Sequence, residues 1–300
     1  MLTRRKFLYS GALAAAGAAA IGADGYFESA HPELKEIEIL LPRLPEAFDG
    51  FRIAQLSDFH YENRLAAVPI RKAIEVVNNR RPDLIVLTGD FVTVPVLDLH
   101  RRTASRAARY AEPCARLLRQ LRAAEGSFAV LGNHDAASDA MKVTSELAAH
   151  GIPVLRNRSI PIERGNARFW LAGIDDVLEG AADLDATVAG VPAGETIVLL
   201  AHEPDFADTV ATKPVDLQLS GHSHGGQIWI PGIGAPWLPP LGRKYPRGLY
   251  QFGNLTLYTN IGIGTIRAPI RLNAPPEISL ITLRSRAPQN RASQKNPNKL

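Results

Sequence analysis

The stretch Gly221-His222-Ser223-His224-Gly225-Gly226 comes directly after the short apolar run Leu217–Ser220, which we expect to be a buried strand. Four other blocks of the chain repeat this arrangement of an apolar strand followed by polar side chains. They are Arg52–Ser57 with Asp58-Phe59-His60, Leu84–Thr88 with Gly89-Asp90, Ser127–Leu131 with Gly132-Asn133-His134-Asp135, and Thr196–Leu200 with Ala201-His202-Glu203. Imidazole, carboxylate and amide groups bind divalent metals, so the pattern predicts a metal centre where these strands end.

Seven of these residues are candidate ligands for two cations. Asp58 and His60 are two residues apart, so along a continuing strand they would project to the same side and hold one cation together. His222 and His224 have the same spacing. Asp90 follows a glycine that allows close backbone approach, and we expect both of its carboxylate oxygens to bridge the ions. The remaining candidates are Asn133, a neutral oxygen ligand, and His202, a nitrogen ligand.

Helical spacing of apolar residues predicts helices over Pro69–Asn79, Thr103–Ala124 and Ala140–His150. They alternate with the first strands as far as Val154, which indicates an α/β fold with a parallel or mixed sheet covered by helices on both faces. After residue 155 short strands are separated mostly by loops, and we expect a second sheet packed face to face with the first. These later strands are Arg168–Gly173, Thr196–Leu200, Leu217–Ser220, Leu255–Asn260 and Ile278–Leu283.

The composition suits one large globular domain, since the 300 residues are 46% hydrophobic and 21% charged. The net charge of +4 comes from the chain ends, where eight basic residues lie in residues 4–6 and 284–299 without an acid; 26 basic and 30 acidic residues remain between them. A mildly acidic body without a basic–aromatic stripe does not favour nucleic-acid binding. The single cysteine, Cys114, excludes an intrachain disulfide and is expected to be a buried structural thiol.

Residues 1–23 have the features of a targeting segment. Thr3-Arg4-Arg5-Lys6-Phe7-Leu8 precedes an Ala/Gly-rich run that is too short and too weakly apolar for a robust membrane span. Paired arginines here are similar to a twin-arginine signal, which directs folded proteins to the twin-arginine export machinery. The alternative is a chance Arg-Arg ahead of a general secretory signal or anchor. We expect export to the periplasm or the outer face of the inner membrane, with cleavage near Ala20 or Ala23 or an uncleaved anchor, and contact with the membrane surface is left open.

Three further segments complete the organisation. Residues 24–50 form a lead-in with one edge strand at Lys35–Leu41, residues 51–283 the main domain, and residues 284–300 a disordered basic tail. A Pro/Gly/Trp-rich loop lies between Gly225 and Gly248, directly after the last candidate ligands. It is either a substrate-recognition element or a packed surface loop with aromatic anchors, and the sequence leaves both readings open.

The order Asp-x-His, Gly-Asp, Gly-Asn-His, His, Gly-His-x-His resembles the calcineurin-like metallophosphoesterase superfamily over residues 50–283. The extended motif ending in Gln227, Asn260-Ile-Gly-Ile-Gly and the stretch Pro269–Glu277 are similar to its bacterial exported YaeI/YkuE-like phosphodiesterase group. The resemblance implies a two-sheet αββα sandwich with the metal site at the C-terminal ends of the strands. It also implies one ion held by Asp58, His60 and His224, another held by Asn133, His202 and His222, and Asp90 bridging both.

The same resemblance implies a binuclear metal-dependent phosphoesterase that cleaves phosphodiester or diphosphate-linked substrates through a metal-bridging hydroxide. Donors of nitrogen and oxygen without a thiolate suit Mn, Fe, Zn or Co. His134 is implied to act as a general acid or charge stabiliser and not as a ligand. The group that orients His134 is unidentified, although Asp135 is adjacent and could orient the loop. Gly89-Asp90 continues into Phe91-Val92-Thr93, without the acidic and arginine residues of phosphoprotein phosphatases, which argues against a protein phosphatase.

The expected substrate is a small-molecule or lipid phosphoester, and alternatives remain. One is a UDP-2,3-diacylglucosamine-type pyrophosphate hydrolase acting on a lipid-linked nucleotide, with Trp229–Leu238 contacting the lipid. The cytoplasmic location of that substrate fits poorly with an export signal. A non-catalytic metal-binding envelope protein is disfavoured by the complete ligand set with His134, and a nuclease by the acidic body of the chain.

Overall fold

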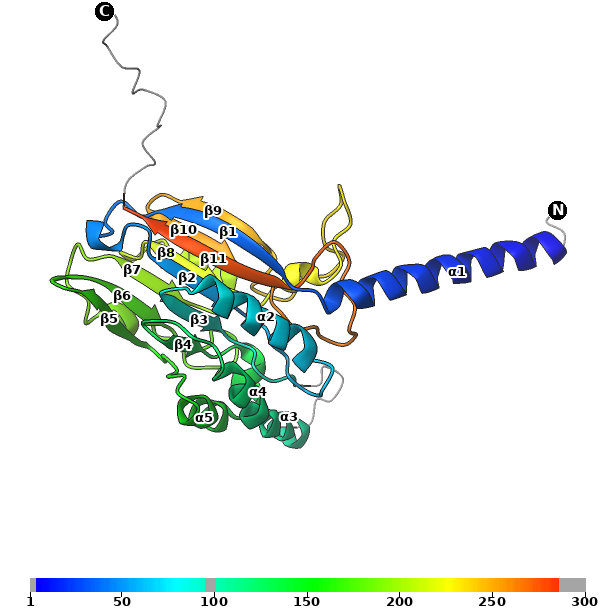
Figure 1. Ribbon diagram of the computed structural model, residues 1–300, viewed down its shortest axis with the longest axis horizontal. Helices are drawn as coiled ribbons and strands as arrows, with labels where there is room; N and C mark the ends of the chain where they lie inside the picture. The colour runs from blue at the N-terminus through cyan, green and yellow to red at the C-terminus, as the bar shows by residue number, and fades with distance from the viewer. Residues whose placement is uncertain (1–3, 95–100, 286–300) are drawn as a thin grey trace, which may run out of the picture.

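The computed structural model describes residues 4–94 and 101–285. Two β-sheets are stacked face to face, with helices over the outer face of the first sheet (Figure 1) and short helices packed on the outer face of the second. This αββα arrangement confirms the predicted fold class. The longest helix, α1 (Arg4–Ser29), projects from one end of the sandwich.

The first sheet has the strand order β1-β11-β2-β3-β4. β2, β3 and β4 run parallel, so their C-terminal ends lie at the same edge of the sheet. β11 is antiparallel to β2 and parallel to β1, and β1 is an edge strand, as the alternating run in the lead-in indicated. The bounds are Glu33–Leu40 (β1), Arg52–Leu56 (β2), Leu84–Thr88 (β3), Ser127–Val130 (β4) and Glu277–Arg284 (β11).

The second sheet has the order β5-β6-β7-β8-β10-β9. Its four central strands are parallel, and β5 and β9 pair antiparallel at the two edges. The C-terminal ends of β7 and β8 therefore also lie together. The bounds are Arg158–Arg164 (β5), Ala167–Gly173 (β6), Ile197–Leu200 (β7), Leu217–Ser220 (β8), Gly248–Phe252 (β9) and Leu255–Thr259 (β10).

Alternation of side chains along β2 separates two parts of the core. Ile53 packs between the sheets, whereas Ala54 and Leu56 pack against the helices. Gln55 also lies between the sheets, where its amide donates to the Ser220 carbonyl oxygen at 2.9 Å. A buried, hydrogen-bonded amide thus connects the two sheets close to the ends of β2 and β8, and it fixes their relative position.

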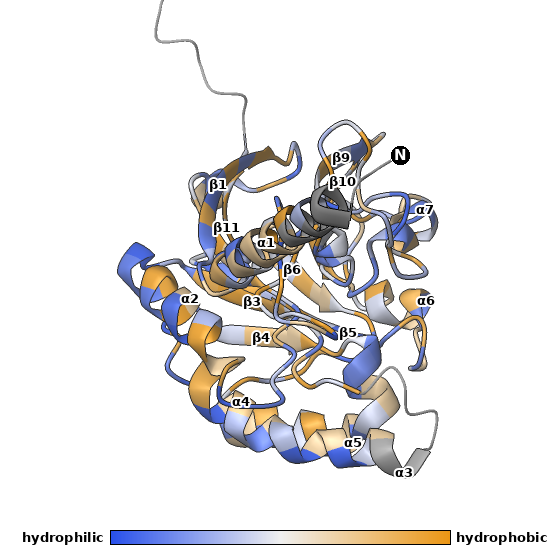
Figure 2. Cartoon of the chain, turned by 90° about the vertical axis from the view of Figure 1, so that its right-hand side faces the viewer, coloured by the Kyte–Doolittle hydropathy of each residue, from blue (hydrophilic) through white to orange (hydrophobic). Residues whose placement is uncertain are grey.

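Helices enclose both sheets. Figure 2, which looks at the end from which α1 projects, shows apolar residues concentrated in the strands and mixed with polar residues in the surrounding helices, as expected for helices that bury one side. The helices and 3₁₀ turns are α2 (Ala67–Arg80), α3 (Arg101–Ala107), η2 (Ala108–Tyr110), α4 (Ala111–Leu118) and α5 (Asn133–Ala149) beside the first sheet, α6 (Leu184–Val188), η3 (Pro204–Phe206) and α7 (Ala207–Val210) beside the second, and η1 (Glu46–Phe48) and η4 (His224–Gly226) in loops.

Two expectations about the sheets are wrong. Helices do not cover both faces of the first sheet, because its inner face packs on the second sheet. The last strand, β11, belongs to the first sheet and not to the second. Ile278 and Leu280 of β11 face the helices while Ile281 faces the other sheet, so β11 is buried on both sides like a central strand.

The single helix predicted over Thr103–Ala124 is also wrong, because the chain forms α3, η2 and α4 in turn and α4 ends at Leu118. Pro113 explains the interruption, since proline lacks an N–H and is tolerated only in the first turn of a helix; α4 restarts at Ala111. Helix α5 spans Asn133–Ala149, but Asp139 inside it has a non-helical backbone (φ −164°, ψ 88°), so the helical run after this kink begins at Ala140, as predicted. Cys114 is fully buried, as predicted.

Helix α1 extends beyond the predicted signal segment as far as Ser29. Its last turns contact the main domain: the Arg271 N–H donates to the Gly25 carbonyl at 2.9 Å, and Glu28 accepts the backbone N–H of Ala274 at 2.8 Å. Within the described ranges, no helix combines the length and apolar character needed to cross a membrane. Of the predicted tail, residues 286–300 lie outside the described residues.

Candidate metal centre

The polar blocks of the sequence all follow strands at one end of the sandwich. Asp58, Asp90 and Asn133 come after β2, β3 and β4, while His202 and His222 come after β7 and β8. Because the two sheets are stacked with these parallel strands side by side, both deliver their ends to the same place. Ligand atoms within 4.8 Å of one another form three groups there: Asp58, His60 and His224; His60, Asp90 and His134; and Asp90, His202 and His222.

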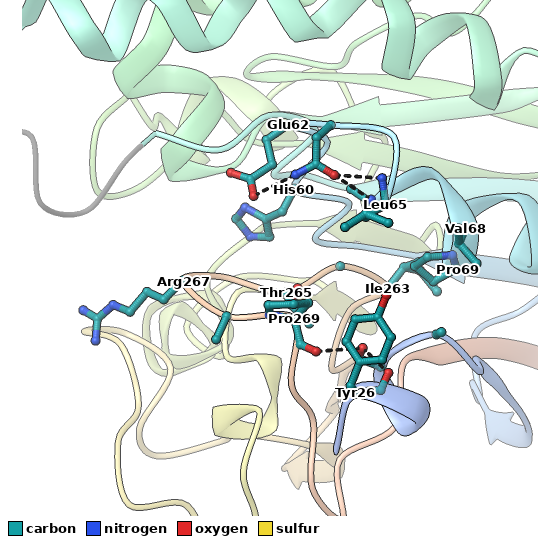
Figure 3. A pocket seen from close by; sticks show the side chains of 16 residues that line it. Tyr26, His60, Glu62, Leu65, Val68, Pro69, Ile263, Thr265, Arg267 and Pro269 are labelled. Atoms are coloured by element: carbon teal, nitrogen blue, oxygen red, sulfur yellow. Dashed lines mark hydrogen bonds between the residues drawn. The ribbon is translucent and has the colours of Figure 1, made fainter. Parts of the chain in front are cut away.

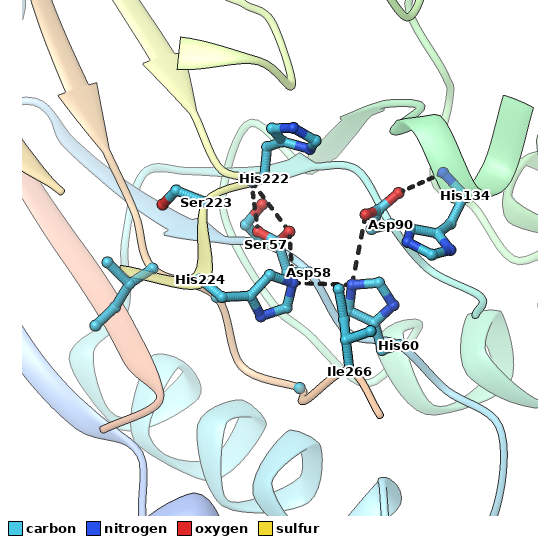
Figure 4. A network of polar contacts seen from close by, with 12 residues as sticks. Ser57, Asp58, His60, Asp90, His134, His222, Ser223, His224 and Ile266 are labelled. Carbon is cyan, nitrogen blue, oxygen red and sulfur yellow. Dashed lines mark hydrogen bonds and ion pairs between the residues drawn. The ribbon is translucent and has the colours of Figure 1, made fainter. Parts of the chain in front are cut away.

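The first group contains Asp58, His60 and His224 (Figure 4). Nε2 of His224 lies 3.3 Å from Oδ1 of Asp58 and 3.0 Å from Nε2 of His60. Both oxygens of Asp58 also accept the backbone N–H of His222 at 3.0 Å, which fixes the carboxylate. The group therefore presents one oxygen and two nitrogens toward a common point.

The second group contains Asp90, His202 and His222, with Asn133 beside it. Nε2 of His202 lies 3.2 Å from Oδ2 of Asp90, and the rings of His202 and His222 are 5.0 Å apart. Asn133 is the first residue of α5 and lines the same cavity as Asp90 and His222. The two groups meet at Asp90, because Nε2 of His60 is 3.4 Å from the same Oδ2 atom.

These residues fit divalent cations. Oδ1 of Asn133 is buried and makes no hydrogen bond to any described residue, and the buried Nε2 of His202 faces Oδ2 of Asp90 at 3.2 Å. A buried polar atom without a partner costs about 1–3 kcal/mol, so such atoms indicate a missing ligand. In the first group, two imidazole nitrogens face each other at 3.0 Å. A cation in each group would give all these atoms a partner, and nitrogen and oxygen donors suit Mn, Fe, Zn or Co.

Backbone carbonyls orient two of the imidazoles, and the sequence did not reveal them. Nδ1 of His202 donates to the Thr88 carbonyl at 2.6 Å, which turns Nε2 toward Asp90. Nε2 of His222 donates to the Pro240 carbonyl at 2.8 Å, which leaves Nδ1 free of hydrogen for a metal. Such partners fix the tautomer and orientation of ligating histidines.

The backbone reaches these positions by an unexpected route. Five of the seven candidate ligands have left-handed backbone conformations, with φ values of 52° for Asp58, 44° for His60, 56° for Asp90, 69° for His222 and 53° for His224. Left-handed conformations are unfavourable for residues other than glycine and cluster at functional sites. The side chains thus converge through tight turns after the strands have ended, and the argument from alternation along a continuing strand is wrong.

The two histidines of the Gly-His-Ser-His motif also separate. His224 belongs to the group of Asp58 and His60, whereas His222 belongs to that of Asp90 and His202. The expectation that they hold one cation together is therefore wrong, and the division matches that implied by the family resemblance. Gly221 allows the chain before His222 to pass close to Ser57 and Asp58, since a Cβ there would lie 1.9 Å from Oγ of Ser57 and 2.4 Å from Oδ2 of Asp58.

Asp90 reaches both groups with one oxygen only. Oδ2 faces His60 and His202, while Oδ1 accepts the backbone N–H of His134 at 2.9 Å. The expectation that both carboxylate oxygens link the ions does not match this geometry. Asp135 accepts the backbone N–H groups of Phe91, at 2.9 Å, and Gly132, at 3.0 Å, so it orients the loop and begins α5.

His134 stands next to the first group, with its ring 4.8 Å from that of His60 and perpendicular to it. Nδ1 of His134 accepts the backbone N–H of Val94 at 3.0 Å. This hydrogen bond identifies the orienting group that the sequence left unidentified. It requires the ring hydrogen to be on Nε2, so His134 can donate a hydrogen bond from that atom.

Burial sets the charge of three imidazoles. Loss of solvent lowers the pKa of both His60 and His222 to about 3 and lowers the pKa of His224 well below its usual range. These rings are therefore neutral near neutral pH, which is the form that binds metals. Burial also raises the pKa of the Asp58 carboxyl group to about 6.

Asp90 and His202 form a charged pair instead. Burial raises the pKa of Asp90, but the nearby His202 and His134 outweigh burial and hold that pKa well below its usual value. In return, Asp90 raises the pKa of His202 against the effect of burial. A cation that binds between them would replace the proton of His202, so metal binding at this position releases a proton.

Arg271 is a further residue of the site that the sequence did not assign. It is fully buried, and its guanidinium donates to the carbonyl oxygens of Gly264, at 2.6 Å, and Ala274, at 2.8 Å. Burial lowers its pKa to about 10, so it remains charged. Nη2 lies 3.4 Å from Nδ1 of His224, so Arg271 holds the loop directly behind this ligand.

Two cavities open beside the centre. The larger, about 650 Å³, has Asp90, Asn133, His134, His222 and His224 in its lining. The smaller, about 270 Å³, lies on the other side of His60 and is bordered by Tyr26 of α1 and by Leu65, Pro69 and Ile263 (Figure 3). Of the loop between Gly225 and Gly248, residues 226–228, 237, 239 and 240 line the larger cavity, while Asp205 accepts the backbone N–H groups of residues 243–245.

Comparison with known proteins gives the family. The profile described as calcineurin-like phosphoesterase matches residues 51–226. The chain is 37% identical over 292 residues to the uncharacterized metallophosphoesterase YkuE of Bacillus subtilis (strain 168), covering 95% of this chain and 98% of YkuE. It is 32% identical over 287 residues to the phosphodiesterase YaeI of Escherichia coli (strain K12), covering 94% and 100%. Among solved structures, a dimetal phosphatase from Danio rerio aligns with 78% of this chain and 99% of its own at 13% identity and a TM-score of 0.44.

The family profile covers more than half of the chain, and both bacterial relatives align over nearly their full lengths. The resemblance drawn from the motifs is thereby confirmed. The chain belongs to the calcineurin-like phosphoesterase family and is a metal-dependent phosphoester hydrolase.

Proposed function

We propose that the protein is a phosphodiesterase that works with two divalent cations. The observation that carries this proposal is the convergence of two ligand groups on Oδ2 of Asp90, in the wall of a cavity large enough for a substrate. Asp58, His60 and His224 would hold one cation, and Asn133, His202 and His222 the other. The name of the relative YaeI supports a phosphodiester as the substrate class.

The cations would supply positive charge for the phosphoryl oxygens and lower the pKa of the attacking water. The chain itself contributes the position of the ligands, which the Thr88 and Pro240 carbonyls and the Asp58 contacts hold before substrate arrives. His134, with its hydrogen on Nε2, can donate to a phosphoryl oxygen or to the departing oxygen.

Removal of metal tests this function. After dialysis against a chelator, hydrolysis of bis(p-nitrophenyl) phosphate should fall by more than about tenfold, because the charge that stabilises the transition state is lost. Addition of Mn²⁺, Fe²⁺, Zn²⁺ or Co²⁺ one at a time should restore the activity and identify the metal. Full activity in protein that elemental analysis shows to be free of metal would contradict the proposal, and faster cleavage of p-nitrophenyl phosphate than of the diester would contradict a phosphodiesterase.

Two other functions considered from the sequence stay as alternatives. A pyrophosphate hydrolase for a UDP-2,3-diacylglucosamine-type substrate would use the mostly apolar lining of the larger cavity. Release of UMP from such a substrate, with no cleavage of simple diesters, would favour it. A non-catalytic metal-binding envelope protein would bind metals with no turnover of any phosphoester.

We also propose that residues 1–23 direct export through the twin-arginine machinery and that the protein acts outside the inner membrane. The hydrogen bonds of Gly25 and Glu28 with the domain lie after the expected cleavage positions, so cleavage near Ala20 or Ala23 would leave them in the mature protein, while an uncleaved α1 could act as an anchor. Replacing both Arg4 and Arg5 by Lys should retain the protein in the cytoplasm of a bacterium with this machinery, as measured by fractionation. Unchanged export of that variant would overturn the assignment of the signal.

A further inference from the structure

The larger cavity combines a polar side at the metal centre with an apolar wall. Its volume of about 650 Å³ is in the range of cavities that bind small organic molecules. A phosphoryl group needs only the polar side, where His134 and His222 lie. Apolar side chains from several segments also line the cavity, among them Leu178, Ile228, Trp237, Ile266 and Ile270, together with the charged side chains of Glu179 and Arg267.

The exposure of this wall indicates a binding surface. Trp237 is 52% exposed, and Leu178 and Ile228 are each 38% exposed. They come from different segments, since Leu178 follows β6 while Ile228 and Trp237 belong to the loop after β8. Apolar side chains gathered around one hollow and left in contact with water mark a ligand site more often than a chance surface.

The wall is held in place before a ligand binds. Gln227, directly after the histidine motif, accepts the backbone N–H of Ile266 and donates to the Ile266 carbonyl at 3.2 Å. The Arg267 guanidinium lies 5.0 Å over the ring of Trp237. Arg267 has a left-handed backbone with φ of 67°. The hydrogen bonds of Gln227 to the neighbouring Ile266 stabilise this unfavourable conformation. A wall fixed in this way loses little entropy on binding.

We propose that this wall, defined by Leu178, Ile228, Trp237, Ile266 and Ile270, binds a hydrocarbon group of the substrate, so that the preferred substrate is an amphiphilic phosphodiester. The inference rests on the proposed function and adds the class of substrate. The phosphoryl group lies at the metal centre while an alkyl chain of the esterified alcohol lies along the ring of Trp237.

A series of alkyl p-nitrophenyl phosphates tests the subsite, with methyl, butyl and octyl esters used below the concentration at which they aggregate. Burial of one CH₂ group is worth about 0.8 kcal/mol, or at most about fourfold in kcat/KM. We therefore expect kcat/KM to rise by at least about tenfold from methyl to octyl. A rate independent of chain length, with the methyl ester still cleaved in a metal-dependent way, would overturn the subsite and leave the proposed function intact.

Two tryptophans of the same loop provide a matched pair. Trp237 lines the cavity, whereas Trp229 does not line it and lies under Arg247 at 4.2 Å. Trp237→Ala should remove most of the gain from methyl to octyl, measured as the ratio of the kcat/KM values for the two esters within the variant. Trp229→Ala should keep the full gain. Equal loss of the chain-length dependence in both variants would show a general role of the loop and contradict the proposal.

Leu178→Ser, on a different segment of the wall, should act in the same direction as Trp237→Ala. A measurement of binding tests the hydrocarbon subsite independently of catalysis. Calorimetry on the metal-loaded protein should give a lower Kd for octyl phosphate than for ethyl phosphate, and Trp237→Ala should reduce that difference. Tighter binding of octyl phosphate by a protein that hydrolyses none of the alkyl p-nitrophenyl phosphate diesters would refute the proposed function and retain the subsite, whereas equal Kd values would refute the subsite.

Discussion

Asp90→Asn is expected to lower kcat/KM for a phosphodiester by about 10³-fold or more, because metal-based charge stabilisation contributes several kcal/mol. Oδ2 of Asp90 is the one atom that faces both ligand groups, 3.4 Å from Nε2 of His60 and 3.2 Å from Nε2 of His202. Asparagine has the same shape, but the His134 N–H will select the amide oxygen for the Oδ1 position. The amide NH₂ then occupies the Oδ2 position, where it cannot bind a cation.

Metal content separates this explanation from loss of folding. Elemental analysis should find two tightly bound metals per chain in the unmodified protein and at most one in Asp90→Asn. Asp216→Asn is a suitable control, because Asp216 is also buried but binds Arg43 and the Ile197 N–H at the start of β8, at the opposite end of that strand from the ligands. It should lose some stability and keep both metals. If Asp90→Asn retained two metals and activity within tenfold, Asp90 would not link the two sites.

The sequence predicted the strands of the centre well, for a physical reason. Leu84–Thr88 and Leu217–Ser220 have the predicted bounds because strands between two covering layers are apolar without interruption, and glycines or polar residues end them sharply. The end of a buried parallel strand is also where the ligands lie. The seven candidate ligands could therefore be picked out from the chain alone, whereas the buried Arg271 behind His224 could not.

The details of the site that the sequence did not predict depend on backbone conformation and backbone carbonyl groups, and the pattern of side chains carries little information about these. The left-handed conformations of Asp58 and His60, and the Thr88 and Pro240 carbonyls that orient His202 and His222, carry no residue-type signature. β11 lies in the first sheet because it pairs with β1 and β2, which are far from it in the sequence, and local sequence patterns do not predict such pairing. Pro113 could have indicated that the helix predicted over Thr103–Ala124 is interrupted, because proline is tolerated only in the first turn of a helix.

His134→Ala is expected to lower kcat by about 10²–10⁴-fold, the range for loss of a proton donor or hydrogen bond in the transition state. His134 is not among the residues that the proposed function assigns to either cation. Its Nδ1 accepts the Val94 N–H, and its Nε2–H is left to donate to a substrate. Both metals should therefore remain bound. His150→Ala is the matched control, since His150 ends α5 and contacts the Glu146 carbonyl outside the centre, and it should leave kcat unchanged.

The leaving group decides between the two roles open to His134. An alkoxide is a poor leaving group and needs a proton, whereas p-nitrophenolate leaves without one. If Nε2–H protonates the departing oxygen, His134→Ala should slow a dialkyl phosphate much more than a p-nitrophenyl ester. If Nε2–H only stabilises charge on a phosphoryl oxygen, both substrates should lose the same factor. A variant with unchanged kcat on both substrates would remove His134 from the catalytic residues, because its donor atom would then contact neither oxygen in the transition state.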